Sequence, residues 1–165
     1  MKVLVTYISR TGNTKKVAEA IIKEIKDTKE IKDLEQVDSL EGYDLAFVGF
    51  PIEAYGPAKQ AVAFLEKHGA GKKIALFITH AASEDDERVK EWIETCKAAA
   101  ASAKLVGTFD CQGELGEQVA DFMLKSGDDN LVAWAKERPT TMGQPDSTKL
   151  KRAGAWAKEV MQSCH

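Results

Sequence analysis

Cysteine is scarce in this sequence of 165 residues, and the three that occur, Cys96, Cys111 and Cys164, lie far apart. None of them belongs to a Cys-x-x-Cys pair, which argues against a disulfide framework. The pattern instead indicates reduced thiols in a cytoplasmic protein.

Long apolar runs are also missing. No stretch approaches the roughly 18–20 apolar residues that a membrane-spanning helix needs, so we expect no membrane insertion. The start of the chain lacks the basic leader and small-residue cleavage site of a signal peptide. A net charge of −3 argues against a nucleic-acid partner, which selects for a concentrated basic face. With 44% hydrophobic and 30% charged residues, the chain fits one globular domain over residues 1–165.

Four segments are nearly continuous in Val, Leu, Ile, Phe and Ala, which is typical of strands buried on both faces of a parallel sheet. They are Lys2–Ile8, Asp44–Phe50, Lys73–Thr79 and Lys104–Asp110. A more polar run, Glu30–Val37, predicts an edge strand. The link from this strand to Asp44 is short, whereas parallel strands need a crossover of about a dozen residues. Either the connection is minimal or the edge strand is misplaced.

Helical spacing fills the segments between the strands. The expected helices are Thr14–Asp27, Pro57–His68, one that Ser83 caps and that buries Trp92, and Asp146–Ser163. Two shorter helices are expected in "EQVADFMLKS" and "DDNLVAWAKE", followed by an irregular loop. The alternation of strands and helices predicts a single α/β domain.

The loop Ser9–Thr14, "SRTGNT", joins the first strand to its helix. Ligands bind at this edge of open parallel sheets, and the positive end of a helix dipole favours an anion. Hydroxyls of Ser9, Thr11 and Thr14, the Asn13 amide and the permissive Gly12 suit a phosphate group. The alternative is a polar turn that only caps its helix.

The loop lacks the motifs of larger nucleotides. A dinucleotide loop reads Gly-x-Gly-x-x-Gly, and here Gly12 stands alone. A triphosphate loop needs a Gly-Lys-Ser/Thr sequence, whereas Asn13 follows Gly12. A terminal phosphate monoester is therefore the favoured ligand.

The motif Ser-Arg-Thr-Gly-Asn-Thr resembles the phosphate loop of flavodoxins and flavodoxin-like FMN proteins of the short-chain type. This resemblance implies a three-layer α/β/α sandwich with a five-stranded parallel sheet of order 2-1-3-4-5. It also implies FMN as the cofactor, with Ser9, Thr11, Gly12, Asn13 and Thr14 at its phosphate. Arg10, in the same loop, would face the phosphate, solvent or a partner.

A second loop, "GFPIEAYGPAKQ", resembles the ring-binding loop of the same family. It places Pro51, Ile52, Glu53, Ala54, Tyr55 and Gly56 beside the flavin ring. Tyr55 would stack on the ring, or it is a surface turn residue. In flavodoxins a backbone flip near the flavin N5 stabilises the one-electron-reduced form, and Gly56 would permit it.

The loop after the fourth long strand would form the other wall of the ring site. It carries His80, Ala81 and Ala82, and no aromatic residue. His80 would contact the flavin, or it is an ordinary residue at a strand end. No second histidine or acid lies at ligand spacing from it, so we expect no metal. Cys111 lies in the loop that would complete the site, either as a buried apolar residue or as a redox thiol.

The resemblance implies a small electron-transfer protein that passes electrons between a reductase and an acceptor enzyme. No catalytic acid or base is then expected, because the flavin supplies the chemistry. The alternative is an FMN-dependent reductase or oxidase that acts directly on a quinone, porphyrinogen or similar molecule. Acidic residues within 83–94, with Glu114, Glu117 and Asp121, would steer a basic partner or serve solubility.

Overall fold

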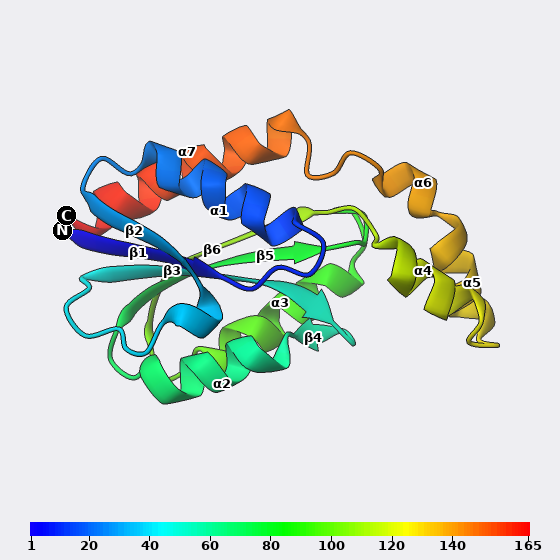
Figure 1. The fold of residues 1–165 in the computed structure, drawn as a ribbon, viewed down its shortest axis with the longest axis horizontal. Helices are drawn as coiled ribbons and strands as arrows, with labels where there is room; N and C mark the ends of the chain where they lie inside the picture. Colours follow the sequence, from blue (N-terminus) through cyan, green and yellow to red (C-terminus); the bar gives the residue numbers. More distant parts are fainter.

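The computed structural model describes all 165 residues. They form one sheet with helices on both of its faces (Figure 1). The strands are β1 (Lys2–Tyr7), β2 (Thr28–Asp33), β3 (Leu45–Glu53), β4 (Gly56–Pro57), β5 (Lys73–His80) and β6 (Lys104–Gln112). The long strands are parallel and lie in the order β2-β1-β3-β5-β6. Counting these five alone, the order is 2-1-3-4-5, which confirms the predicted topology.

The helices form the two outer layers and a separate group at one end. They are α1 (Asn13–Glu24), α2 (Lys59–His68), α3 (Arg88–Ala99), α4 (Glu117–Leu124), α5 (Asp129–Lys136), α6 (Arg138–Thr141) and α7 (Ser147–Cys164), with a 3-10 turn η1 at Leu34–Gln36. In Figure 1, α1 and α7 cover one face of the sheet, and α2 and α3 cover the other. None of the helices is long and apolar enough to cross a membrane.

Alternate side chains of each buried strand enter two separate hydrophobic cores. Val3 and Val5 point to the α1/α7 side with Phe47 and Phe77, whereas Leu4 lies in the core under α2 and α3. All five side chains have no exposed surface. Residues buried on both faces explain why the strands read as continuous apolar runs.

The edge strand ends four residues earlier than its sequence suggests. Because β2 stops at Asp33, the connection to β3 runs from Leu34 to Asp44 and includes η1. Leu34, Val37 and Leu40 are buried along it. This connection is long enough to cross over β1, so the short link inferred from the sequence was an error in the strand's boundaries.

Two helix starts were also predicted wrongly. Pro57 does not begin a helix, because it pairs antiparallel with Ile52 in β4, and α2 starts at Lys59. Ser83 does not cap α3, which starts at Arg88. The Asp86 carboxylate instead accepts a hydrogen bond from the Arg88 backbone N–H at 3.0 Å. The acids before Arg88 therefore belong to a loop and not to the first helical turn.

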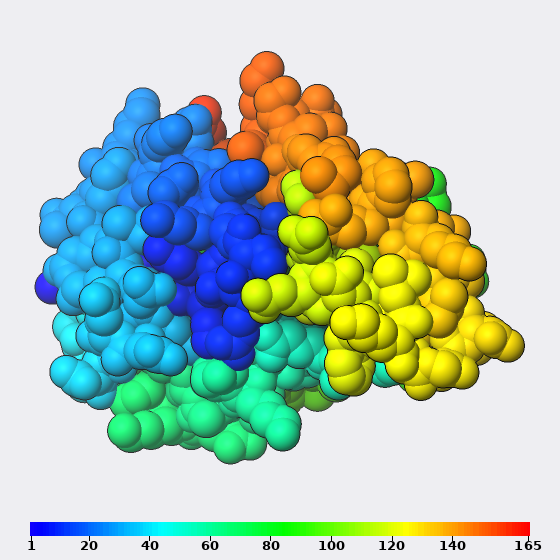
Figure 2. Space-filling model, turned by 45° about the vertical axis from the view of Figure 1, so that its right-hand side comes forward, coloured from blue at the N-terminus to red at the C-terminus, as the bar shows by residue number.

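Helices α4, α5 and α6, which we call the helical unit, lie beyond the carboxyl ends of the strands (Figure 1). In the space-filling view of Figure 2, this segment, coloured lime to orange, abuts the blue N-terminal segment. The unit has a small core of its own around Leu115, Ala120 and Ala135. The short helices predicted in this part of the chain are confirmed, and α6 adds one turn where an irregular loop was expected.

The buried hydroxyl of Thr141 fastens the helical unit to the end of the sheet. It accepts a hydrogen bond from the Leu115 N–H at 2.9 Å and donates one to the Arg138 carbonyl at 2.7 Å. Arg138 in turn donates from Nε to the Leu115 carbonyl at 2.9 Å. Two of these hydrogen bonds hold Leu115 against α6, and the third lies within α6.

We expect Thr141→Val to destabilise the protein by about 1–3 kcal/mol, because it leaves the buried Leu115 N–H without an acceptor. Thr141→Ser keeps the hydroxyl and is the matched control. Urea unfolding measures the loss, and amide hydrogen exchange at Leu115 shows whether the unit loosens locally. Equal losses for the two variants would show that the methyl group matters and the hydrogen bonds do not.

Candidate functional site

The loop Ser9–Thr14, which we call the phosphate loop, is folded around its own serine. Ser9 Oγ accepts hydrogen bonds from the backbone N–H groups of Gly12, at 3.1 Å, and Lys15, at 3.4 Å. Gly12 has a φ of 95°, a left-handed conformation that turns these groups inward. An oxygen atom therefore already sits where two N–H groups of a helix start converge, which is the arrangement that binds a phosphate oxygen.

Two threonine hydroxyls meet beneath this loop. Thr14 Oγ1 and Thr79 Oγ1 lie 2.8 Å apart, and both residues are buried. Their mutual hydrogen bond uses only one of the two hydroxyl hydrogens, so the second is free to donate to another acceptor. The first turn of α1 carries no acidic residue, which leaves its positive end available to an anion.

Arg10 points away from the phosphate loop and links it to the neighbouring loop. Its Nε donates to Glu53 Oε1 at 2.8 Å and its Nη2 donates to Gln60 Oε1 at 2.9 Å. The hydrogen bond to Glu53 raises the pKa of the Arg10 guanidinium above its usual value. Arg10 thus fixes the distance between the phosphate loop and the loop that contains Glu53. The sequence predicts that these two loops bind opposite ends of one ligand.

The loop Pro51–Gly56, which we call the ring loop, is a tight hairpin. Ile52 pairs with Pro57 and Glu53 with Gly56, which leaves Ala54 and Tyr55 as the two turn residues. Both have positive φ, 49° and 65°, as a two-residue turn of this handedness requires. Non-glycine residues resist this conformation by about 1–2 kcal/mol each. The backbone strain therefore lies at Ala54 and Tyr55, two positions and one position before Gly56, to which the sequence assigns conformational freedom.

Three aromatic rings cluster at the tip of the ring loop. The Tyr55 ring lies 5.7 Å from Trp92 of α3 and 6.4 Å from Trp134 of α5, measured between ring centroids. The two tryptophan rings are 6.0 Å apart and nearly parallel. Tyr55 keeps 53% of its surface exposed, so the cluster is open to a ligand on one side.

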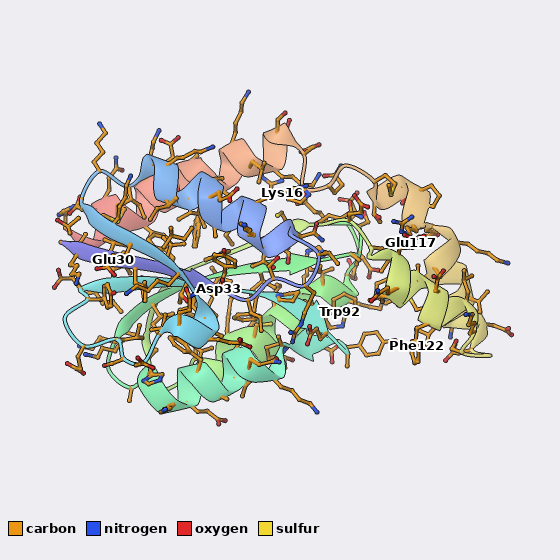
Figure 3. The ribbon with its side chains drawn as sticks, viewed as in Figure 1. Lys16, Glu30, Asp33, Trp92, Glu117 and Phe122 are labelled. Carbon is orange, nitrogen blue, oxygen red and sulfur yellow. The ribbon has the colours of Figure 1, made fainter.

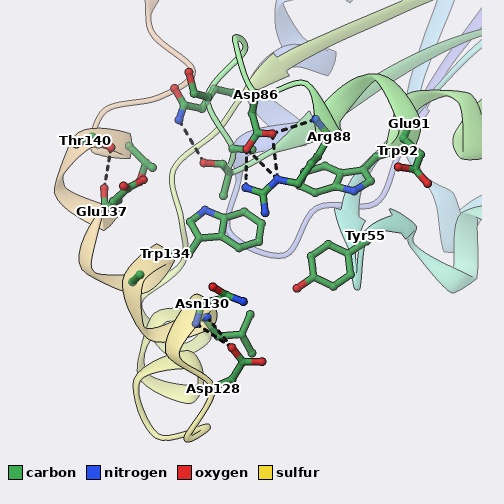
Figure 4. Close-up of a pocket in the computed structure, with 17 residues that line it drawn as sticks. Tyr55, Asp86, Arg88, Glu91, Trp92, Asp128, Asn130, Trp134, Glu137 and Thr140 are labelled. Carbon is green, nitrogen blue, oxygen red and sulfur yellow. Dashed lines mark hydrogen bonds and ion pairs between the residues drawn. The ribbon is translucent and has the colours of Figure 1, made fainter.

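Arg88 and Asp86 form a rim beside these aromatic rings (Figure 4). Arg88 donates from Nε and Nη2 to the Asp86 carboxylate, with a shortest distance of 2.6 Å. Its guanidinium lies 5.6 Å from the Trp134 ring centroid and 5.9 Å from that of Trp92. The same hydrogen bonds lower the pKa of Asp86, so this carboxylate is ionised at neutral pH.

A narrow channel leads from the phosphate loop into a wider slot. The channel has a volume of about 140 Å³, and Arg10, Thr11 and Asn13 lie on its wall. The slot, of about 510 Å³, is lined mostly by apolar side chains, including Tyr55, Trp92 and Trp134. The two cavities share the residues Ile52, Glu53, His80, Ala81, Leu115 and Val119. A molecule with a phosphate at one end and a flat apolar ring at the other fits the channel and the slot together.

The helical unit supplies the outer wall of the slot. Val119, Phe122 and Met123 of α4 line it, and Phe122 is 71% exposed at its mouth. Figure 3 shows Phe122 on α4 at the same end of the molecule as Trp92. The slot therefore lies between the carboxyl ends of the strands and α4.

A family comparison agrees with this geometry. The sequence profile of the family described as "Flavodoxin domain" matches residues 4–157. The chain belongs to the flavodoxin family. Flavodoxin domains bind FMN, so membership confirms the cofactor predicted from the sequence, and the channel and slot provide surfaces for its phosphate and ring.

Individual proteins are similar to this flavodoxin-family protein over about two thirds of its length or more. It is 36% identical to the flavodoxin-like domain-containing protein BilS of Clostridioides difficile (strain CD3), covering 98% of this chain and 97% of BilS. The structure of oxidised flavodoxin 2 from Bacillus cereus superposes with a TM-score of 0.64 at 19% identity, over 99% of both chains. A flavoprotein from Lactobacillus acidophilus, solved in complex with FMN, gives a TM-score of 0.54 at 22% identity, over 66% of this chain and 92% of that one.

The structure brings most of the sequence-predicted residues of this flavodoxin-family protein to one place. Arg10, Thr11, Asn13, Pro51, Ile52, Glu53, Ala54, Tyr55, His80 and Ala81 line the channel or the slot. Ser9, Gly12 and Thr14 shape the phosphate loop from within, and Ala82 lines a third cavity next to the slot. Gly56 lies in β4 behind the turn. These assignments of roles stay predictions.

Cys111 is placed differently. It is fully buried in the core under α1 and α7 and lines none of the three cavities described here. Burial, helped by the charges of Glu84 and Asp110, raises the pKa of its thiol to about 12. Cys111 therefore fits the role of a buried apolar residue, which the sequence left open beside that of a redox thiol.

The sequence does not identify Trp92 and Trp134 as part of a ligand site. It predicts Trp92 only as a buried residue on its helix, and it places Trp134 in a short helix without assigning it a role. The absence of an aromatic residue at Ala81 and Ala82 is compensated by these rings from α3 and α5. The usable signal was Trp134 itself, a large aromatic side chain in a short helix after the last strand.

We expect iodoacetamide at pH 8 to modify Cys164 alone in the folded protein. Cys96 and Cys111 are fully buried, and burial raises the pKa of each thiol to about 12, so the reactive thiolate is scarce at both. Mass spectrometry of the native and the urea-unfolded protein should find one and three modified cysteines. Labelling of native Cys111 would contradict the burial described here.

Proposed function

We propose that this flavodoxin-family protein binds FMN with its phosphate in the phosphate loop and its ring in the slot, and carries electrons between a reductase and an acceptor enzyme. The observation that carries the proposal is the channel, which joins the converging N–H groups of one loop to the aromatic slot of another. FMN supplies the redox chemistry, and the residues of this chain bind and orient it.

The phosphate loop binds without a lysine or a metal. A phosphate oxygen takes the acceptor role that Ser9 Oγ now fills toward the Gly12 and Lys15 N–H groups. The Ser9 hydroxyl is then free to donate, and the spare hydrogen of the Thr14 and Thr79 pair supports the same anion. Charge-assisted hydrogen bonds of this kind are shorter and stronger than neutral ones.

The slot excludes water from the ring. Tyr55, Trp92 and Trp134 present flat apolar surface, and α4 covers the outer side. The Arg10 and Glu53 ion pair holds the ring loop at a fixed distance from the phosphate loop. Such preorganisation reduces the ordering that binding requires.

The surface around the slot supports transfer to another protein. Phe122 and Tyr55 are exposed beside it, and α4 carries the acids Glu117 and Asp121. An exposed apolar patch near acidic residues favours a partner with basic residues around its own redox centre. The cytoplasmic location expected from the unpaired cysteines is part of this proposal.

A second candidate function rests on the third cavity, which we call the side cleft. It measures about 680 Å³ and shares Tyr55, Trp92 and Trp134 with the slot. A small conjugated molecule such as a quinone would stack there within reach of the flavin. The chain would then be an FMN-dependent reductase or oxidase that needs no partner protein.

The phosphate loop is tested by comparing two ligands. Thr11→Ala removes a hydroxyl of the channel wall, and a lost hydrogen bond to a charged group costs about 1.5–3 kcal/mol. We therefore expect FMN affinity to fall about 10- to 100-fold. Riboflavin lacks the phosphate and should bind the variant and the original protein equally.

Thr28→Ala is the control for this test, because Thr28 is an exposed threonine on the remote edge strand. Flavin fluorescence titration measures all the affinities. A parallel loss of FMN and riboflavin binding would place the phosphate elsewhere and refute the assignment.

The two candidate functions are separated by photoreduction and turnover. A carrier should accumulate a stable one-electron-reduced flavin and oxidise NADH or NADPH with a quinone only when a reductase is added. A direct reductase should turn over without one, and Ala133→Trp, which fills the side cleft, should abolish that turnover while FMN affinity is unchanged. Partner-free turnover that the cleft variant blocks would reject the carrier.

A further inference from the structure

His80, the last residue of β5, is buried at the base of the FMN site. It keeps 4% of its surface exposed and lines both the channel and the slot. Its Nδ1 lies 3.0 Å from the Ala82 carbonyl oxygen, and its Nε2 lies 2.9 Å from Asp110 Oδ2 on β6. Both ring nitrogens are thus committed to partners within the protein.

Both partners of His80 are acceptors. A carbonyl oxygen only accepts hydrogen bonds, and so does an ionised carboxylate. A neutral imidazole has one N–H group and one lone pair, so it can satisfy only one of these two oxygens. With a second proton, the ring donates to both Ala82 and Asp110, and the bond to Asp110 becomes charge-assisted.

Asp110 is paired with His80, whereas the acids that line the cofactor site are paired with arginines. The two carboxylates that line the slot or the channel are each paired with an arginine: Glu53 with Arg10, and Glu114 with Arg138. His80 is the only ion-pair partner of Asp110.

Asp86 also lies near His80, but its carboxylate is already paired with Arg88. The nearby thiols of Cys96 and Cys111 have pKa values raised to about 12, with Asp110 contributing to both, so they stay neutral. Asp110 itself is about one third exposed, which gives the buried ring a route to protons from solvent. The structure therefore provides a place for one positive charge at the base of the slot. Burial of the ring, whose side chain is 1% exposed, opposes that charge until a negative charge arrives nearby.

We propose that His80 takes up a proton when the bound flavin is reduced. A bound FMN would take up two electrons from an external reductant and one solvent proton, and it would then carry one negative charge. A second solvent proton would go to His80, which would carry one positive charge, so two electrons and two protons would enter together. The proposal rests on FMN binding in the slot and not on the identity of any redox partner.

The number of protons taken up per electron pair tests this step. Protein loaded with FMN is photoreduced at pH 7.5 in weak buffer with an indicator dye. We expect close to two protons in the original protein and close to one in His80→Gln, whose side chain cannot titrate. Asp110→Asn removes the anion that stabilises the charged ring and should give fewer than two.

His68→Gln is the matched control, since His68 ends α2 in contact with Phe64 and lies outside all three cavities. It should take up two protons, as the original protein does. Equal uptake by His80→Gln and the original protein would overturn the proposal.

Nitrogen-15 NMR of the histidine rings answers the same question without a substitution, so it decides the matter even where His80→Gln folds poorly. The shifts of Nδ1 and Nε2 should report one N–H group in the oxidised protein and two in the reduced protein. The same protonation in both states overturns this proposal alone. Failure of the original protein to retain FMN overturns both this proposal and the proposed function.

Discussion

The hydrogen bond from Asn13 Nδ2 to the Glu114 carbonyl, 2.9 Å long, joins the phosphate loop to the helical unit. The adjoining Gly113 permits this close approach, because a Cβ atom there would lie 2.5 Å from the Asn13 amide nitrogen. Leu115 and α4 follow at once and form the outer wall of the slot. One contact between distant parts of the chain therefore sets the position of the slot's outer wall relative to the phosphate loop.

Two ion pairs between arginines and acids lie around this site. Ion pairs connect Arg10 with Glu53 and Arg88 with Asp86, and each pair joins or stiffens loops that end at the slot. Exposed pairs of this kind contribute little to global stability, with a median of about 0–1 kcal/mol. Their value lies in orientation, because they hold loops that would otherwise have several conformations.

The sheet and the phosphate loop were predictable from the sequence, whereas the walls of the slot were not. Buried strands such as Lys73–His80 have a local apolar signature, and the loop around Gly12 has a local motif. Pro57 and Ser83 belong to residue types that are common at helix starts, and the sequence therefore predicts helices there. In the structure, Pro57 pairs in β4, and the Asp86 carboxylate, not Ser83, accepts a hydrogen bond at the start of α3. Trp134 reaches the site only through the packing of α5 on α4, which no local pattern encodes.

The helical unit leaves β6 and returns to α7, so both of its ends are attached at the same edge of the molecule. Its small core around Ala120 and Ala135 is separate from the two cores that hold the sheet together. The sequence of this unit is therefore free to vary at its outer face while the layers that fold the protein stay constant. The face that the helical unit presents to other molecules can thus change without disturbing the layers that fold the protein.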